Sequence, residues 1–197
     1  MRLENNESKS STSYFFDRDG TINIDHGYIS GTEHFEFIDG AIEAMHELIT
    51  MGFILVLITN QSGIGRGIFS QDQFIQLTRW MSSFLERNHI HLAGVYFCPH
   101  HPHALIKQLR KSCDCRKPKP GMFFAAQKKL HINMLHSYMV GDKIEDMQAA
   151  KSAGVGTKVL LRSTNLINIT KDKMIADWIL NGLRDLPSRI KQTKKSI

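Results

Sequence analysis

Short apolar runs alternate with stretches of helical periodicity along the chain, and this alternation restricts the fold more than any other feature. Residues 53–58 form a continuous apolar run, which is typical of a strand buried on both faces. Residues 41–51 have the spacing of an amphipathic helix and are followed by Gly52. Strands separated by helices favour right-handed crossovers, so the expected fold class is α/β, a doubly wound parallel sheet with helices on both faces.

The predicted elements follow one another in a regular order. Ser70 is the expected N-cap of the second helix. Strands are expected at residues 13–16, 53–58, 94–97, 137–140, 157–161 and 178–180. Helices are expected at residues 41–51, 71–87, 120–130, 145–153 and 183–190.

The length and composition are those of one globular domain. The chain has 197 residues, of which 42% are hydrophobic, enough for a sizeable core. We expect a single domain over residues 14–190, a disordered segment at 1–13 and a basic tail at 191–197. No apolar run approaches the roughly 20 residues that span a bilayer, and no secretory signal is present. A cytoplasmic protein without a membrane partner is therefore expected.

Polar residues of a consistent kind follow three of the predicted strands. In a parallel sheet the ligand site lies beyond the carboxyl ends of the strands, so these three tips should converge on one crevice. The tips are Asp17-Arg18-Asp19-Gly20-Thr21, Thr59-Asn60-Gln61-Ser62-Gly63, and Gly141-Asp142-Lys143 with Asp146 four residues after Asp142.

The acidic residues of these tips suit phosphate-ester chemistry. Residues two apart in extended backbone point the same way, so Asp17 and Asp19 can face one reaction centre. Mg²⁺ prefers carboxylate oxygens, which Asp17 and Asp142 can supply. Asp17 can then attack phosphorus, and Asp19 can protonate the leaving group and later deprotonate water. Thr59 offers a hydroxyl to the transferring phosphoryl group, and Lys117 offers a positive charge.

A cysteine–histidine segment lies between the third strand and Lys117. Cys98 and His100 are followed by Cys113 and Cys115, the natural ligands of a closed tetrahedral zinc site. Three cysteines without an export signal favour metal binding over a disulfide framework. Zinc would have a structural role, since it would hold a long loop in place. The alternatives to His100 as the fourth ligand are His101 and His103.

The polar tips resemble the motifs of the haloacid-dehalogenase superfamily of phosphatases. Phe16 to Thr21 resembles its first motif, Ile58-Thr59-Asn60 its second, Lys117 its third, and Gly141 to Asp146 its fourth. The resemblance implies a Rossmann-like core. It also implies that the backbone carbonyl of Asp19 joins Asp17 and Asp142 as a ligand of Mg²⁺. The segments between the motifs leave no room for a lid, so a capless enzyme is expected.

The zinc loop narrows the resemblance to the heptose 1,7-bisphosphate 7-phosphatases and the related histidinol-phosphate phosphatases. The shared runs include Asp25-His26-Gly27-Tyr28, Cys98-Pro99-His100-His101-Pro102 and Cys113-Asp114-Cys115-Arg116-Lys117. The resemblance implies removal of the phosphate at carbon 7 of the sugar, in the synthesis of a lipopolysaccharide core precursor. By the same resemblance, the residues that contact substrate are Asp25, His26, Gly27, Tyr28, Thr59, Asn60, Gln61, Ser62, Arg116, Lys117 and Lys143.

Several alternatives remain open at this point. Arg116 is expected to set specificity, although it could instead pair with Asp114 at the surface. The substrate could be histidinol phosphate, or the 3′-phosphate of a nucleic acid, since the net charge is +6. A magnesium-binding signalling domain would also use clustered aspartates. We expect a small phosphorylated sugar as substrate, no nucleic-acid partner and a monomer.

Overall fold

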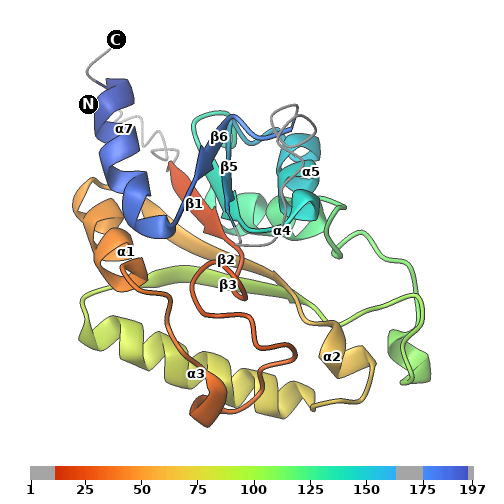
Figure 1. Cartoon of the computed structure of the whole chain (residues 1–197). Coiled ribbons are helices and arrows are strands. Elements are labelled where there is room, and N and C mark those ends of the chain that lie inside the picture. Colours follow the sequence, from red (N-terminus) through yellow and green to blue (C-terminus); the bar gives the residue numbers. More distant parts are fainter. Residues whose placement is uncertain (1–11, 163–174, 195–197) are drawn as a thin grey trace, which may run out of the picture.

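A computed structural model describes residues 12–162 and 175–194 of the chain. Its centre is a six-stranded sheet in the order β3-β2-β1-β4-β5-β6, in which every pair of neighbours is parallel (Figure 1). The predicted doubly wound parallel sheet is therefore confirmed. The strands are β1 (Ser13–Phe16), β2 (Ile54–Asn60), β3 (Leu92–Cys98), β4 (Tyr138–Gly141), β5 (Thr157–Leu161) and β6 (Trp178–Leu180).

Helices connect the strands much as the periodicity predicts. The helices are α1 (Ala41–Thr50), α2 (Ser62–Gly65), α3 (Gln71–Arg87), α4 (Gly121–Leu130), α5 (Ile144–Ser152) and α7 (Leu186–Lys194). Short 3₁₀ turns lie at Thr32–His34, Lys107–Leu109 and Leu183–Asp185. The one-turn helix α2 and the first two 3₁₀ turns were not predicted, because so short a segment shows no apolar period.

The two predicted ends of the domain differ from what the structure describes. Ser13, which was included both in the predicted first strand and in the segment expected to be disordered, is buried in β1, and its N–H donates to Ser137 Oγ at 3.0 Å. Helix α7 continues past the predicted end at 190 to Lys194, and Lys191 forms an ion pair with Glu47 of α1. Residues 1–11 and 195–197 lie outside the described residues, so the expectations for them stay predictions.

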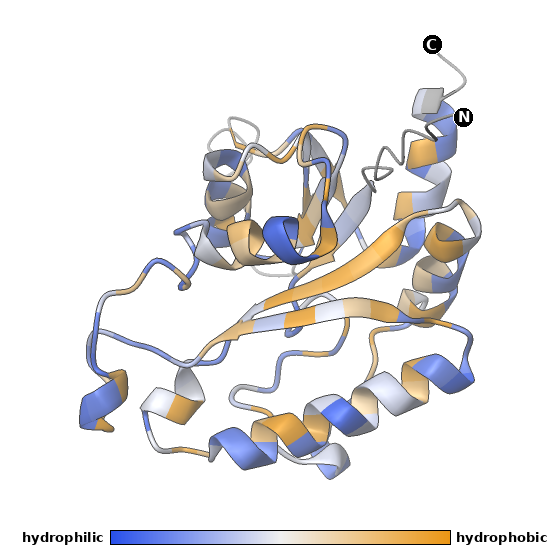
Figure 2. Ribbon diagram, turned by 180° about the vertical axis from the view of Figure 1, so that it is seen from behind, coloured by the Kyte–Doolittle hydropathy of each residue, from blue (hydrophilic) through white to orange (hydrophobic). Residues whose placement is uncertain are grey.

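The side chains of β1 divide the core into two parts. Tyr14 and Phe16 belong to a cluster with α1, α3 and α7, whereas Phe15 belongs to a cluster with α4 and α5. This alternation follows from the period of two along a strand. Figure 2 shows β2 as an almost continuously hydrophobic ribbon, which fits a strand with helices on both faces.

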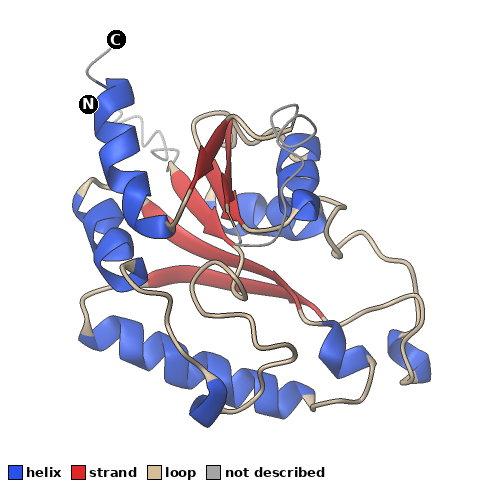
Figure 3. Cartoon of the chain, viewed as in Figure 1, coloured by secondary structure: helices blue, strands red, loops and turns tan. Residues whose placement is uncertain are grey.

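The carboxyl ends of β1, β2 and β4 lie side by side. Phe16 of β1 is in register with Leu57 of β2 and Val140 of β4. The Asp17 N–H donates to the Val140 carbonyl at 3.0 Å, so the pairing continues one residue past β1. The polar tips therefore leave the sheet at one edge, where the loops gather (Figure 3). Among the described residues, no helix has the length and apolar character needed to cross a membrane.

Helix α3 begins with the predicted cap at Ser70. The Gln73 N–H donates to Ser70 Oγ at 3.1 Å, and the Ser70 N–H donates to Gln73 Oε1 at 2.8 Å. This reciprocal pair is a capping box, which satisfies two backbone donors at the start of a helix. The capping box fixes the residue at which α3 begins after α2.

Replacing Ser70 with alanine should lower the free energy of unfolding by about 1 kcal/mol, because the first turn of α3 loses its cap. Chemical denaturation of the two proteins measures this difference. Ser112→Ala, at an exposed loop serine, is the matched control and should leave the stability unchanged. Equal stability of Ser70→Ala and the unmodified protein would contradict the structural role of the capping box.

Candidate active site

The ammonium group of Lys117 lies between two buried carboxylates at this edge of the sheet. Lys117 Nζ is 2.8 Å from Asp17 Oδ1 and 2.6 Å from Asp146 Oδ1, and it donates to the Ile58 carbonyl at 2.9 Å. All three charged side chains are almost completely buried. Burial alone would lower the pKa of Lys117, but the charges of Asp146 and Asp17 raise it above its usual value. The lysine therefore stays positively charged.

Asn60, at the end of β2, holds the backbone of Lys117 in place. Its Nδ2 donates to the Lys117 carbonyl at 3.1 Å, and its Oδ1 accepts from the Lys117 N–H at 3.0 Å. Two hydrogen bonds to one residue fix both the position and the direction of the chain there. The β2 tip and Lys117 are thus linked, since Asn60 of the tip positions the backbone of the lysine.

The carboxylates of Asp17, Asp142 and Asp146 form a group that could hold a metal ion. One oxygen of each lies within 4.8 Å of the others, and Asp142 Oδ1 is buried without a hydrogen-bond partner in the described structure. Burial, together with the charges of Asp17 and Asp146, raises the pKa of Asp142 to about 7, although Lys143 opposes this. A hard divalent cation would supply the missing positive charge.

The backbone at Gly20 packs closely against the carboxylate of Asp142. Gly20 has φ = +82°, and a Cβ at this position would collide with the carboxylate of Asp142. Only glycine allows the first tip to turn so close to the fourth strand's tip. Asp17 and Asp142 therefore meet as predicted, and the third carboxylate beside them is that of Asp146.

The carboxylate of Asp19 has different neighbours. Arg18 Nε donates to its Oδ1 at 3.1 Å, and Arg18 Nη2 donates to its Oδ2 at 3.0 Å. Asn23 Nδ2 donates to Oδ1 at 3.0 Å, and Gln61 Nε2 donates to Oδ2 at 3.1 Å. Gln61 Nε2 also donates to Thr59 Oγ1 at 2.9 Å. The two aspartates of the first tip thus lie in separate networks, one with a lysine and one with an arginine.

Both networks open onto one cavity of about 520 Å³. It is lined by Asp17, Asp19, Asp25, Gly27, Tyr28, Thr59, Asn60, Gln61, Ser62, Gly63, Arg116, Lys117, Pro118, Lys143, Glu145 and Asp146. Every predicted substrate-contact residue is included except His26. No substrate contact was predicted for Gly63, Pro118 or Glu145, which also line the cavity.

His26 lies outside this cavity. Its ring is about half exposed, its Nε2 is 3.8 Å from Glu36 Oε2, and it lines a separate hollow with Tyr28 and His34. The predicted contact of His26 with substrate is therefore not supported by its placement. Gly27 and Tyr28, the two residues that follow His26 in this turn, both have positive φ.

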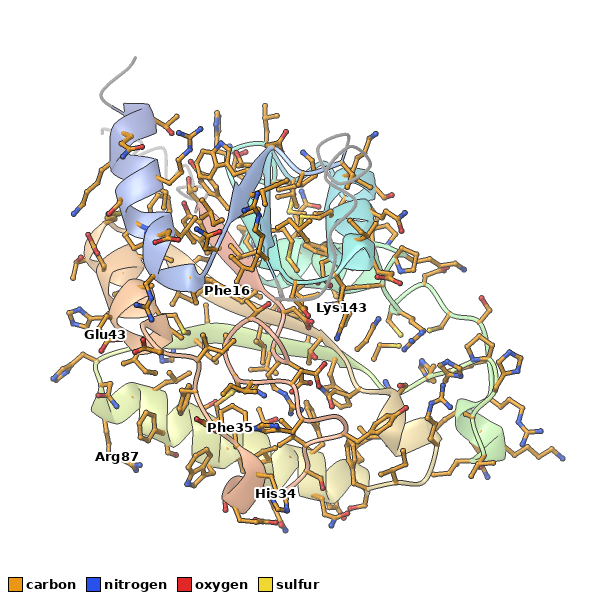
Figure 4. All side chains as sticks on the ribbon, viewed as in Figure 1. Phe16, His34, Phe35, Glu43, Arg87 and Lys143 are labelled. Carbon is orange, nitrogen blue, oxygen red and sulfur yellow. The ribbon has the colours of Figure 1, made fainter. Side chains whose placement is uncertain are left out.

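An ion pair crosses the mouth of the cavity. Lys143 Nζ is 3.2 Å from Asp25 Oδ2, and Asp25 Oδ1 accepts from the Gly27 N–H at 3.0 Å. Burial would raise the pKa of Asp25, but the Gly27 N–H and Lys143 lower it below its usual value. Figure 4 shows Lys143 close to the carboxyl end of β1, where Phe16 is labelled. The loop before α1 is thereby tied to the tip of β4.

The loop between β3 and α4 brings four metal-ligand residues together. Cys98, His100, Cys113 and Cys115 each offer one atom, and these atoms all lie within 4.8 Å of one another. All three cysteines are free thiols, with Cys115 Sγ 2.9 Å from Cys98 Sγ and 3.2 Å from His100 Nδ1. Three thiols and one imidazole are a donor set that suits zinc. Figure 1 shows this loop running out beyond α2 and returning to α4.

The other two histidines of the loop have different partners. His101 Nε2 is 3.0 Å from Arg66 Nη2, and His101 Nδ1 accepts from the His103 N–H at 3.1 Å. His100 is therefore the histidine that the structure places with the thiols.

The charged residues of the same loop have separate partners. Asp114 forms an ion pair with Lys119 at 3.2 Å, and Arg116 reaches the His100 carbonyl at 3.5 Å. The alternative pairing of Arg116 with Asp114 is thus not what the structure shows.

A carboxylate at the end of a parallel strand, with a buried lysine and a second carboxyl two residues on, is the arrangement of a phosphate-ester hydrolase. A family model described as HAD-hydrolase-like matches residues 114–186. The chain has 31% identity and a TM-score of 0.74 with a putative HAD-like phosphatase from Mesorhizobium loti, covering 81% of this chain and 76% of that one. The chain is a phosphoric monoester hydrolase with a HAD-like fold.

Full-length relatives define the family more closely. The chain is 55% identical over 188 residues to D-glycero-beta-D-manno-heptose-1,7-bisphosphate 7-phosphatase from Escherichia coli O6:H1, covering 95% of this chain and 98% of the relative. It is 58% identical over 181 residues to the enzyme of that name from Photorhabdus laumondii, covering 92% and 96%. The chain belongs to the family of the D-glycero-beta-D-manno-heptose-1,7-bisphosphate 7-phosphatases.

A solved structure supports the same assignment. It is the D,D-heptose 1,7-bisphosphate phosphatase from B. bronchiseptica, determined in complex with magnesium and phosphate. The TM-score is 0.80 at 25% identity, and the alignment covers 92% of this chain and 99% of the other. A protein of this fold thus binds both the metal and the anion that the acidic edge of the present sheet suits.

Replacing Asn60 with alanine should lower kcat for p-nitrophenyl phosphate by about tenfold or more. The Lys117 backbone would lose both partners, which costs about 1–3 kcal/mol and lets the ammonium move away from Asp17. Steady-state kinetics and chemical denaturation measure the two effects. Asn133→Ala, at a turn where Asn133 Oδ1 accepts the His136 N–H, is the control and should keep full activity. An unchanged kcat for Asn60→Ala would show that Lys117 does not need this clamp.

Proposed function

We propose that this protein hydrolyses the phosphate at carbon 7 of D-glycero-β-D-manno-heptose 1,7-bisphosphate and leaves heptose 1-phosphate. The observation that carries this proposal is identity of 50–58% to enzymes of that name, over more than nine-tenths of both chains. In the bacteria that make it, the product is a precursor of the lipopolysaccharide core. We further propose that the enzyme acts in the cytoplasm as a monomer, with no nucleic-acid partner.

Asp17 supplies the nucleophile in this proposal. One of its carboxylate oxygens bonds to phosphorus while the bond from phosphorus to the carbon-7 oxygen breaks. The electron pair stays on the carbon-7 oxygen, which takes a proton from Asp19 and leaves as a hydroxyl group. A water molecule then returns a proton to Asp19 as its oxygen bonds to phosphorus. The bond between Asp17 and phosphorus breaks, and inorganic phosphate leaves.

The remaining residues of the edge hold the reacting groups. Thr59 and Lys117 bind the oxygens of the transferring phosphoryl group, since one is a buried hydroxyl and the other a buried cation. Asp146 keeps Lys117 beside Asp17. Mg²⁺, held by Asp17, Asp142 and the backbone carbonyl of Asp19, would screen the negative phosphate from the negative nucleophile.

The rim of the cavity suits a substrate with a second phosphate. The segment from Pro99 to Lys119 carries six lysine and arginine residues but only one acidic residue, Asp114. Such a surface attracts a small, highly charged anion. Arg116 lines the cavity and offers a planar fork of donors, so it is the residue proposed to bind the second phosphate or the sugar hydroxyls. Lys143 would hold the phosphate end of the site, and Asp25, Gly27 and Tyr28 would contact the sugar.

Turnover of a substrate panel tests the proposed function. The panel contains both anomers of the heptose bisphosphate, histidinol phosphate and an oligonucleotide with a 3′-phosphate. We expect the β-anomer of the bisphosphate to have the highest kcat/KM, with release of one phosphate per molecule. A higher kcat/KM for histidinol phosphate, or a steep salt dependence of oligonucleotide binding, would instead support one of the alternative substrates.

Asp17→Asn should reduce kcat by about 10³-fold or more, because the amide is a poor nucleophile. The fold should persist, since asparagine has nearly the same size. Phosphate release and circular dichroism measure the two properties. Asp72→Asn, on the exposed first turn of α3, is the control and should keep full activity. Full activity of Asp17→Asn would mean that another group is the nucleophile.

The four loop residues would bind one structural zinc ion, which fixes Arg116 and Lys117 next to Cys115. His100→Ala should therefore reduce the zinc content measured by elemental analysis and lower the melting temperature by about 10 °C or more. His103→Ala, at an exposed histidine of the same loop, should keep both the zinc and the melting temperature. Loss of zinc in His103→Ala but not in His100→Ala would reverse the assignment.

A further inference from the structure

Arg18, between the two aspartates of the first tip, is a charged side chain that is almost completely shielded from solvent. Only 1% of it is exposed. Its guanidinium group lies over the ring of Phe74 of α3, 5.6 Å from the ring centroid. A buried charge is costly unless it is paired, so an arginine is retained at such a position only with close partners. Its acidic partner is Asp19, the next residue in the chain.

The carboxylate of Asp19 receives four hydrogen bonds, two on each oxygen. Arg18 Nε and Asn23 Nδ2 donate to Oδ1 at 3.1 and 3.0 Å, while Arg18 Nη2 and Gln61 Nε2 donate to Oδ2 at 3.0 and 3.1 Å. An ionised carboxylate has about four lone-pair sites, so all of them are occupied. The plane of the carboxyl group is therefore fixed from both sides, with the planar fork of Arg18 supplying half of the donors.

Proton transfer requires one of these four donors to leave. Asn23 is completely buried and does not line the cavity, whereas Gln61 lines it and has a second acceptor in Thr59 Oγ1. Gln61 is thus the donor that can withdraw when a proton arrives, and Oδ2 is the oxygen it would free. Arg18 keeps contact with both oxygens during this exchange, so the carboxyl group does not rotate.

Arg18 also reaches the loop that carries the sugar contacts. Its Nη2 donates to the Ile29 carbonyl at 3.2 Å, one residue after Tyr28. Ile29 is itself buried in the core. The guanidinium group therefore joins the proton-carrying carboxyl to the loop that lines the cavity, and movement of either one is transmitted to the other.

We propose that Arg18 is a positioning residue, which holds the Asp19 carboxyl in line with the leaving oxygen and directs its Oδ2 toward the proton transfer. This inference rests on the proposed function, because it assumes that Asp19 is the general acid. The side chain does not touch the reacting atoms. Its effect is on the step in which the leaving oxygen takes a proton, and not on the attack of Asp17 on phosphorus.

The test compares two substrates that differ in their need for a proton. The sugar alkoxide must be protonated as it leaves, whereas p-nitrophenolate spreads its charge over the ring and leaves without a proton. For Arg18→Gln, kcat/KM for the heptose bisphosphate should fall by about 100-fold or more, the size of a general-acid contribution. With p-nitrophenyl phosphate it should fall by less than about fivefold. Arg18→Lys keeps the charge but lacks the planar fork of donors. Its kcat/KM should therefore fall by less than that of Arg18→Gln, and the fall should again be larger for the heptose bisphosphate than for p-nitrophenyl phosphate.

Two further variants separate positioning from general damage. Gln61→Leu removes one donor from Oδ2, and it should also reduce kcat/KM more for the sugar phosphate than for the aryl phosphate. Arg184→Lys changes an exposed arginine that pairs with Asp39, and neither residue lines the cavity, so it should affect neither substrate. Binding of inorganic phosphate, measured by calorimetry, should be unchanged in Arg18→Gln if only the carboxyl group has moved.

Equal losses with both substrates in the Arg18 variants would overturn the proposal, as would a fully active Arg18→Gln. If Arg18→Gln does not fold, Arg18→Lys and Gln61→Leu decide the question by the same ratio. The proposed function fails separately, when the unmodified enzyme does not hydrolyse the heptose bisphosphate. In that case the comparison of alkyl and aryl phosphates can still be made with any alkyl phosphate that the enzyme accepts.

Discussion

The buried ammonium group of Lys117 is the interaction on which the active site depends. It contacts Asp17 at the end of β1, Asp146 in the first turn of α5 and the carbonyl of Ile58 in β2. One side chain thus joins three segments that are far apart in the sequence. Two buried carboxylates so close together would repel each other without this positive charge. Lys117 therefore holds Asp17, the proposed nucleophile, and Asp146 together.

The loop with the four potential metal ligands lies directly before this lysine in the chain. Cys115 is two residues before Lys117, and Cys98 ends β3, the strand beside β2. The Cys98 carbonyl accepts the Gln61 N–H at 2.8 Å, and Asn60 next to it clamps the Lys117 backbone. The metal-ligand cluster, the β2 tip and the lysine are thus one connected unit. A metal ion in this loop would stabilise the active site without taking part in the reaction.

The two aspartates of the first tip each contact a cation, but their other neighbours differ, and this difference suits the different roles proposed for them. Asp17 faces a lysine and two further carboxylates, an arrangement that suits a metal ion and a phosphoryl group. Asp19 faces the fork of Arg18 and two amide donors, an arrangement that holds a carboxyl group in one plane. The proposed roles of nucleophile for Asp17 and acid for Asp19 thus rest on a difference in the surroundings of two side chains of the same chemistry.

Much of this could be predicted from the sequence because it depends on local patterns. Apolar runs and helical spacing predicted the strands within a few residues, and the order of the polar tips predicted one shared crevice. The contacts of Arg18 with Asp19 and of Asp146 with Lys117 could not be predicted, since they depend on side-chain directions after the chain has turned. The position of His26 outside the cavity could not be predicted for the same reason.

The most direct measurement is a crystal structure of the enzyme with Mg²⁺ and beryllium fluoride, which mimics a phosphoryl group on a carboxylate. We expect beryllium bonded to an oxygen of Asp17, with Lys117 Nζ still within hydrogen-bond distance of both Asp17 and Asp146. An adduct on Asp19 or Asp142, or a Lys117 side chain that turns away from both carboxylates, would contradict the central role of the buried lysine.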